Sequence, residues 1–147
     1  MTIPPVLREI LVDADRPLAF AVFTQRIGAW WPLGEHSVHG AGATVAFDRL
    51  EVGGRIVESL AGADDAVWGT VTRWEPDTML GFTWHPGHGD ERASQVTVSF
   101  EDQDGKTLVR LEHSGWEVLG EQAQAARDEY DHGWPVVLDR YAAAVTA

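Results

Sequence analysis

The most regular pattern of apolar and polar positions lies near the end of the chain, in residues 125–145. Its large apolar residues recur every three or four positions, which places them on one face of an α-helix. They are Tyr130, Trp134, Val137, Leu138, Tyr141 and Val145. The charged residues Asp139 and Arg140 fall on the opposite side. Because Pro135 cannot donate a backbone hydrogen bond, we expect a kink or a restart there, with a shorter helix over residues 120–130.

Most of the chain before residue 115 predicts β-strands, because apolar and polar residues alternate in short runs separated by Gly, Pro and Asp. The predicted strands cover residues 7–12, 44–50, 55–60, 67–74, 79–84, 95–100 and 106–114. After the first strand, Asp13 or Asp15 can cap a helix that has Pro17 in its first turn. A short helical turn over residues 29–32 follows, and residues 33–42 predict a loop.

These elements together predict an α+β fold in a single domain that spans residues 1–147. A helix with one apolar stripe must bury that stripe, and the inner face of a curved antiparallel sheet is the available surface. A chain of this length can bury about two thirds of its unfolded surface in one core. The alternation leaves one point open, which is the face of the sheet that Trp68 and Trp74 take.

The composition narrows the range of functions. A formal net charge of −12 opposes binding to phosphate backbones, so we expect no nucleic-acid partner. The absence of cysteine excludes disulfides, thiolate catalysis and cysteine–zinc sites, and it fits a cytoplasmic location. We expect no membrane insertion, because no apolar run approaches the ~20 residues of a spanning helix, and we see no secretion signal. The seven tryptophans suit either a packed core or the wall of a ligand pocket.

Short motifs in a fixed order run through nearly the whole chain. They are Trp30-Trp31-Pro32, Phe47-Asp48, Val52-Gly53-Gly54, Gly69-x-Val71, Glu75-Pro76, Leu80-x-Phe82-x-Trp84, Val96-Thr97-Val98-x-Phe100, Thr107-x-Val109-x-Leu111-x-His113-x-Gly115 and Tyr130-x-x-Gly133-Trp134. The ordered set resembles the START-related helix-grip superfamily (SRPBCC) and, within it, the branch named for homology to the activator of the heat-shock-protein-90 ATPase. The resemblance implies a curved antiparallel sheet wrapped around a long C-terminal helix, with two short helices after the first strand. Members bind lipids, sterols or polyketides, or cyclise or dehydrate polyketides, so the resemblance specifies the fold more closely than the function.

The resemblance also implies a cavity between the sheet and the last helix. The apolar residues at inward-facing positions are the candidates for its wall, although each could equally fill a packed core. They are Trp30, Trp31, Phe47, Phe82, Trp84, Val98, Leu111, Trp134 and Tyr141. His113 shares the inward face of its strand, so it could bind a ligand, act as an acid or base, or be a core histidine bonded to a backbone carbonyl. His36 could lie at the mouth of the pocket.

Three classes of function remain open. The leading hypothesis is binding of a hydrophobic small molecule, such as a lipid, polyketide or aromatic metabolite, without catalysis. One alternative is an enzyme of the polyketide cyclase or dehydratase kind that uses His113 or Arg73, and the other is an interaction module for a chaperone ATPase or another protein partner. A homodimer is also compatible with the pattern. We expect no cofactor and no metal, because the neighbouring histidines lie in glycine-rich loops, in the pairs His36 with His39 and His85 with His88.

Overall fold

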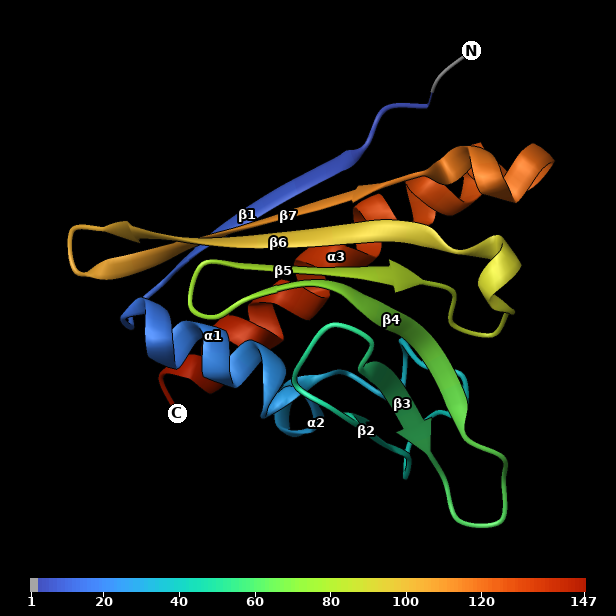
Figure 1. Ribbon diagram of the computed structural model, residues 1–147, viewed down its shortest axis with the longest axis horizontal. Helices are drawn as coiled ribbons and strands as arrows, with labels where there is room; N and C mark the ends of the chain where they lie inside the picture. Colours follow the sequence, from blue (N-terminus) through green and yellow to red (C-terminus); the bar gives the residue numbers. More distant parts are fainter. Residues whose placement is uncertain (1–2) are drawn as a thin grey trace.

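Seven antiparallel strands form one sheet in the order β1-β7-β6-β5-β4-β3-β2 in this computed structural model, which describes residues 3–147 (Figure 1). The strands are β1 (Val6–Val12), β2 (Thr44–Phe47), β3 (Arg55–Ser59), β4 (Ala66–Glu75), β5 (Met79–Trp84), β6 (Ser94–Gln103) and β7 (Lys106–Ser114). Each predicted strand is present, and the α+β helix-grip architecture is confirmed. Sequence neighbours pair throughout except at β1, which pairs with β7 and so brings the two ends of the chain together.

Alternation along the strands separates a buried face of the sheet from an exposed one. On β7 every second residue from Thr107 to His113 is buried. The pairs Val98 with Leu111 and Phe100 with Val109 lie opposite each other on the neighbouring strands β6 and β7. Because side chains of directly opposed residues share a face, these pairs build the concave, apolar side of the sheet.

Irregular pairing around β4 bends the sheet and settles the orientation of its two tryptophans. The register shifts between Val71 and Arg73, so that Val71 and Trp74, three positions apart, both turn toward the core. Trp68 is also inside, at 1% exposure. At Gly69 the chain passes so close to β5 that an added Cβ would lie 1.7 Å from the Thr83 carbonyl oxygen, which only glycine tolerates.

Two short helices follow the first strand, as expected. In α1 (Arg16–Thr24) the Asp15 carboxylate caps the helix by accepting from the Leu18 backbone N–H at 3.1 Å. The second, α2 (Ile27–Trp30), begins and ends two residues earlier than the predicted turn. The early end is caused by Pro32, which disfavours helical geometry at the residue before it, and Trp31 is extended with φ −60° and ψ 130°.

The last helix, α3 (Ala123–Val145), follows a 3₁₀ segment, η2 (Trp116–Gln122), and continues through Pro135. The expected restart at Pro135 and the separate helix over residues 120–130 are therefore wrong. Proline leaves the carbonyl of Asp131, four residues earlier, without its helical partner. Arg8 of β1 supplies the replacement, because its Nη2 donates to the Asp131 carbonyl oxygen at 2.9 Å and to the carboxylate at 2.6 Å.

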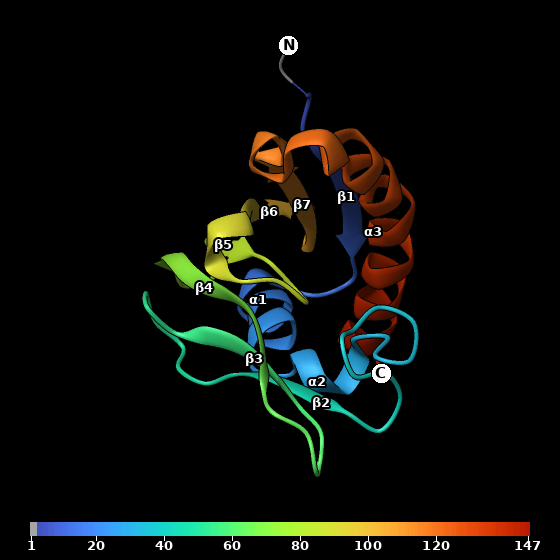
Figure 2. The ribbon, with the colours of Figure 1, turned by 90° about the vertical axis from the view of Figure 1, so that its right-hand side faces the viewer.

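The concave side of the sheet is covered by helices. Along its length α3 packs against β1, while α1 packs against β6, β7 and the C-terminal part of α3 (Figures 1 and 2). A third short segment, η1 (Asp90–Arg92), joins β5 to β6. Within residues 3–147 there is no helix with the length and apolar character needed to cross a bilayer.

Candidate functional site

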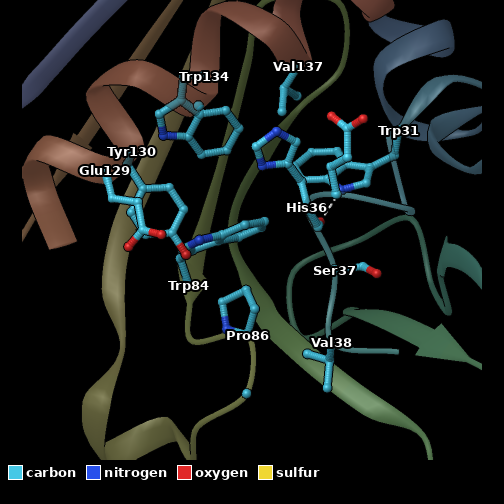
Figure 3. A pocket seen from close by; sticks show the side chains of 13 residues that line it. Trp31, His36, Ser37, Val38, Trp84, Pro86, Glu129, Tyr130, Trp134 and Val137 are labelled. Carbon is cyan, nitrogen blue, oxygen red and sulfur yellow. Dashed lines mark hydrogen bonds between the residues drawn. The ribbon is translucent and has the colours of Figure 1, made fainter. Parts of the chain in front are cut away.

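A cavity of about 400 Å³ lies where α3, the end of β5 and the loop after α2 meet (Figure 3). We call it the tryptophan pocket. Its walls are formed by Trp31, Glu35, His36, Ser37, Val38, Trp84, Pro86, Gly87, Glu129, Tyr130, Gly133, Trp134 and Val137. Three segments far apart in sequence thus contribute to one site, and α3 supplies five of the lining residues.

Three indole rings form the apolar floor and side of this pocket. The ring centres lie 5.8 Å apart for Trp31 and Trp84, 5.5 Å for Trp84 and Trp134, and 5.9 Å for Trp31 and Trp134. The Tyr130 ring continues the wall at 6.1 Å from Trp134. Flat π-surfaces at such spacing offer stacking and edge contacts to a planar aromatic ligand.

Two of the indole rings are held in place by hydrogen bonds from their Nε1–H groups. The Trp31 Nε1–H donates to the backbone oxygen of His36 at 2.7 Å, which ties the ring to the loop. The Trp134 Nε1–H donates to Nδ1 of His113 at 3.0 Å. These bonds fix the orientation of both walls, so the apolar faces are presented in a preformed arrangement.

His113 lies behind Trp134 and is fully buried. Because Nδ1 accepts from Trp134, the ring carries its proton on Nε2, which donates to Ser94 Oγ at 2.7 Å, and Ser94 donates onward to the Trp84 carbonyl at 3.3 Å. Burial lowers the pKa of His113 to about 3. Both nitrogens are occupied and the ring is neutral at physiological pH, so His113 orients Trp134 and has no free group for acid–base chemistry.

A buried carboxylate holds the loop that closes one side of the pocket. Glu58 of β3 accepts from the backbone N–H groups of Val38 and His39 at 2.8 Å each, and from the Trp68 indole at 2.9 Å. Burial alone would raise the pKa of Glu58, but these hydrogen bonds and one with Ser37 outweigh it and lower the pKa. Glu58 is thus an ionised anchor for this wall.

One polar group of the pocket wall has no partner. The Nε1–H of Trp84 is buried and makes no hydrogen bond in the described part of the chain. Burial raises the pKa of the neighbouring Tyr130 hydroxyl, the Trp84 N–H opposes this rise, and the Glu129 carboxylate adds to it. The N–H therefore lies near the hydroxyl without meeting the geometry of a hydrogen bond, and it stays available to an acceptor.

Gly133 widens the pocket at its centre. An added Cβ would lie 3.5 Å from the Cε1 atom of His36, which is an ordinary contact distance, so the glycine leaves room for about one methyl group beside the imidazole. The His36 ring makes no hydrogen bond among residues 3–147 and points into the cavity beside Trp31 (Figure 3). It is the histidine of this site whose nitrogens are free.

The structure divides the eleven predicted site residues into two groups. Trp31, His36, Trp84 and Trp134 meet at the tryptophan pocket. The others do not line it and pack in or against the core; they are Trp30, Phe47, Phe82, Val98, Leu111, His113 and Tyr141. Sequence reasoning missed Tyr130 and Val137 as site residues, although both share the helical stripe of Trp134 and could have been included on that ground.

Two of the loop histidines bond to backbone oxygens through their rings. His39 Nε2 lies 2.9 Å from the Asp64 carbonyl oxygen, and His85 Nδ1 lies 2.9 Å from that of His88. Across the described residues, 3–147, no group of three His, Cys, Asp or Glu side chains could hold a metal ion. The loop histidines therefore do not form a second candidate site for a metal in this part of the chain.

Comparison with solved structures identifies relatives of the same architecture. An anthrahydroquino-γ-pyrone synthase, Txn09, is 29% identical with a TM-score of 0.64, and the match covers 96% of each chain. CalU16 from Micromonospora echinospora is 24% identical over 99% of this chain and 81% of that one, with a TM-score of 0.67. The Aha1 protein from Colwellia psychrerythraea, solved as a dimer, is 16% identical with a TM-score of 0.69, over 97% and 96% of the two chains.

Comparison with functionally curated proteins found no match. The family model described as "Activator of Hsp90 ATPase homolog 1-like protein" matches residues 13–146, which include every element from α1 to α3. The predicted resemblance is confirmed, and the chain belongs to the family of Activator of Hsp90 ATPase homolog 1-like proteins.

Proposed function

We propose that this protein binds a planar, polycyclic aromatic small molecule of the polyketide type in the tryptophan pocket. The observation that carries the proposal is the meeting of Trp31, Trp84 and Trp134 around an unfilled volume of about 400 Å³. Small-molecule sites commonly have volumes of about 300–1,000 Å³ and mostly apolar walls with a few fixed polar groups. The pocket has both properties.

The unpartnered N–H of Trp84 supports a ligand that carries oxygen on its rings. A buried donor without an acceptor costs about 1–3 kcal/mol, which a ligand carbonyl or hydroxyl would recover. The Tyr130 hydroxyl lies near this N–H without forming a hydrogen bond with it, so a ligand oxygen would compete with that hydroxyl for the donor. An aromatic ketone or quinone satisfies both the apolar walls and this donor.

A second candidate function is enzymatic, and one observation favours it. The likeness to Txn09, an anthrahydroquino-γ-pyrone synthase that is 29% identical over nearly full length, supports a polycyclic aromatic ligand and a reaction that forms a ring on it. The group that could move a proton in this pocket is the free imidazole of His36. The His113 ring is already occupied by Trp134 and Ser94. Loss of turnover with retained binding in His36→Ala would support catalysis, whereas equal turnover would remove His36 from the mechanism.

The binding proposal is tested by titrating the protein with a neutral hydroxymethyl anthraquinone and following tryptophan fluorescence and calorimetry. We expect saturable binding with one site per chain. Trp84→Ala should weaken binding by about tenfold or more, while Trp84→Phe, which keeps a ring and loses the N–H, should weaken it less. Trp74→Phe is the matched control, because Trp74 packs outside the pocket against Phe20 and Phe47. Unchanged affinity in Trp84→Ala would contradict the proposal.

Self-association is a separate proposal. The Aha1 relative from Colwellia psychrerythraea is described as a dimer, and at 16% identity it supports only the shared fold. Light scattering over a range of protein concentrations would distinguish a monomer from a homodimer of this chain. Co-purification of a chaperone ATPase without any bound small molecule would favour the interaction-module alternative over the ligand-binding proposal.

A further inference from the structure

A second cavity of about 350 Å³ adjoins the tryptophan pocket. The two cavities share four lining residues, Trp84, Pro86, Glu129 and Tyr130, so one wall separates them. The outer walls of the second cavity come from η1, η2 and the first turns of α3. A ligand that stacks on the tryptophan-pocket side of this wall can therefore extend a substituent over its edge into the second cavity.

The second cavity contains a guanidinium group without an acidic partner. Arg92 is the one arginine or lysine that lines either cavity. Its Nη2 donates to the side-chain oxygen of Gln122 at 2.8 Å, and its Nε–H is buried with no hydrogen-bond partner. No carboxylate of residues 3–147 forms an ion pair with it.

This isolation is unusual for the chain. The formal net charge is −12, with 23 acidic residues against 11 basic ones, and most of the other arginines form ion pairs. A guanidinium presents several donors in a fixed plane that matches a carboxylate. Gln122 already orients one of its nitrogens, so part of the entropy cost of fixing the side chain is met before any ligand arrives.

One carboxylate near the second cavity, that of Glu129, would repel an anionic ligand. Glu129 lines both cavities, and its side chain is exposed at the rim. Solvent screens an exposed carboxylate more strongly than it screens a buried one. An anionic ligand is therefore favoured here only if its attraction to Arg92 is stronger than its repulsion by Glu129. Removing the charge of Arg92 should weaken the binding of an anion, and removing the charge of Glu129 should strengthen it.

We propose that the second cavity is a subsite for a carboxylate carried by the aromatic ligand, with Arg92 as the group that recognises it. The rings lie in the tryptophan pocket, and the carboxylate passes the shared wall at Pro86 and Tyr130 to reach the guanidinium. This inference rests on the proposed function, since it concerns a substituent of the same ligand. It narrows the ligand to an aromatic carboxylic acid.

The test compares two probes of the same ring system, an anthraquinone carboxylate and the neutral hydroxymethyl anthraquinone, by calorimetry at neutral pH. In the unmodified protein we expect the carboxylate to bind roughly tenfold tighter. Arg92→Gln should remove this preference by lowering the affinity of the carboxylate much more than that of the neutral probe, whereas Glu129→Gln should increase the preference. Arg26→Gln is the charge-matched control, because Arg26 is exposed, forms no ion pair in the described chain and lies outside both cavities.

The outcomes separate the two proposals. A neutral probe that binds while the carboxylate binds no tighter overturns the Arg92 subsite and leaves the tryptophan pocket standing. A preference that survives in Arg92→Gln, or that falls equally in Arg26→Gln, overturns the subsite as well, because the attraction is then not local. Failure of both probes to bind overturns both proposals. Loss of the preference in Arg92→Gln alone, with its gain in Glu129→Gln, supports the subsite.

Discussion

The two halves of α3 place aromatic side chains against the same sheet, but these side chains pack together in one half and line a cavity in the other. Toward the C-terminus, Tyr141 meets Phe23 and Trp30 at ring distances of 5.1 and 5.2 Å. We call this the closed end. Toward the N-terminus, Tyr130 and Trp134 face the tryptophan pocket, which we call the open end.

The difference lies in what covers each half. At the closed end, α1 inserts Phe20 and Phe23 into the concave side of the sheet, and their rings pack against Phe100. At the open end the cover is a loop held by Glu58, and the helix has Gly133 where a side chain would project. Aromatic residues fill a core where a second helix closes it, and they line a cavity where a loop takes its place.

The largest expected effect breaks the closed end. Phe23→Ala removes a ring that is 1% exposed and contacts three other rings, so we expect a loss of about 3–5 kcal/mol in the free energy of unfolding. Urea denaturation measures this loss. Val38→Ala, in the exposed loop of the open end, should change stability by less than about 0.5 kcal/mol. Similar losses in both variants would mean that the two ends are equally well packed.

The next effect releases the loop at the open end. In Glu58→Gln an amide replaces a carboxylate that accepts three N–H groups, so one donor loses its acceptor or meets another donor. We expect a loss of about 2–3 kcal/mol in the free energy of unfolding and weaker binding of the neutral anthraquinone. Chemical denaturation and calorimetry measure the two effects. Normal ligand affinity in this variant would show that the loop does not shape the pocket.

An effect of intermediate size concerns pH. The pKa of His113 falls to about 3 in the folded state, so the unfolded chain binds a proton more readily between about pH 6.5 and 3. This contribution to stability is complete above pH 6.5 and is lost as the pH falls through that window. It amounts to about 2 kcal/mol between pH 6.5 and pH 5.

His113→Gln isolates this contribution, because glutamine keeps an acceptor and a donor and cannot take up the proton. The difference in unfolding free energy between the unmodified protein and this variant should shrink by about 2 kcal/mol when the pH is lowered from 7.5 to 5. Denaturation at the two pH values measures it. A difference that does not depend on pH would mean that the ring is already protonated, or is exposed, in the folded state.

The smallest effect narrows the open end. Gly133→Ala adds a methyl group at an ordinary contact distance of 3.5 Å from the His36 ring, and alanine favours a helix interior by about 1 kcal/mol over glycine. We expect a gain of about 0.5–1 kcal/mol in stability together with weaker binding of the anthraquinone, because the methyl group occupies the pocket. A stabilised variant with unchanged affinity would place the ligand away from Gly133.

The fold could be predicted from the sequence because most of its strands alternate and its last helix carries one continuous stripe. Two local features could not. The continuation of α3 through Pro135 depends on Arg8, a residue 123 positions away in the chain, and no local pattern reveals such a partner. The orientation of Trp74 depends on the register shift within β4, which breaks the alternation that sequence reasoning relies on.

Only part of the candidate site could be predicted from the sequence, and the reason is physical. The spacing of Trp134 and Tyr141 shows that both side chains lie on the same face of the helix. It does not show which further element fills the space beside each one. Tyr141 donates its hydroxyl hydrogen to the Ala19 carbonyl of α1 at 2.7 Å and is enclosed, whereas Trp134 meets a loop. His113 was identified as inward-facing, and its role behind Trp134 follows from a side-chain network that spans β6, β7 and α3.

The bond between Arg8 and Asp131 also bears on the order in which the molecule assembles. It joins the first strand to the last helix, and β1 pairs along its whole length with β7, so these contacts close loops of about a hundred residues or more. Contacts of such long range form late, because the entropy of closing the intervening chain must be met first. We therefore expect the sheet from β2 to β6 to gain protection from hydrogen exchange during refolding before α3 does. The tryptophan pocket, which needs α3 for Tyr130 and Trp134, would then be completed in the final step.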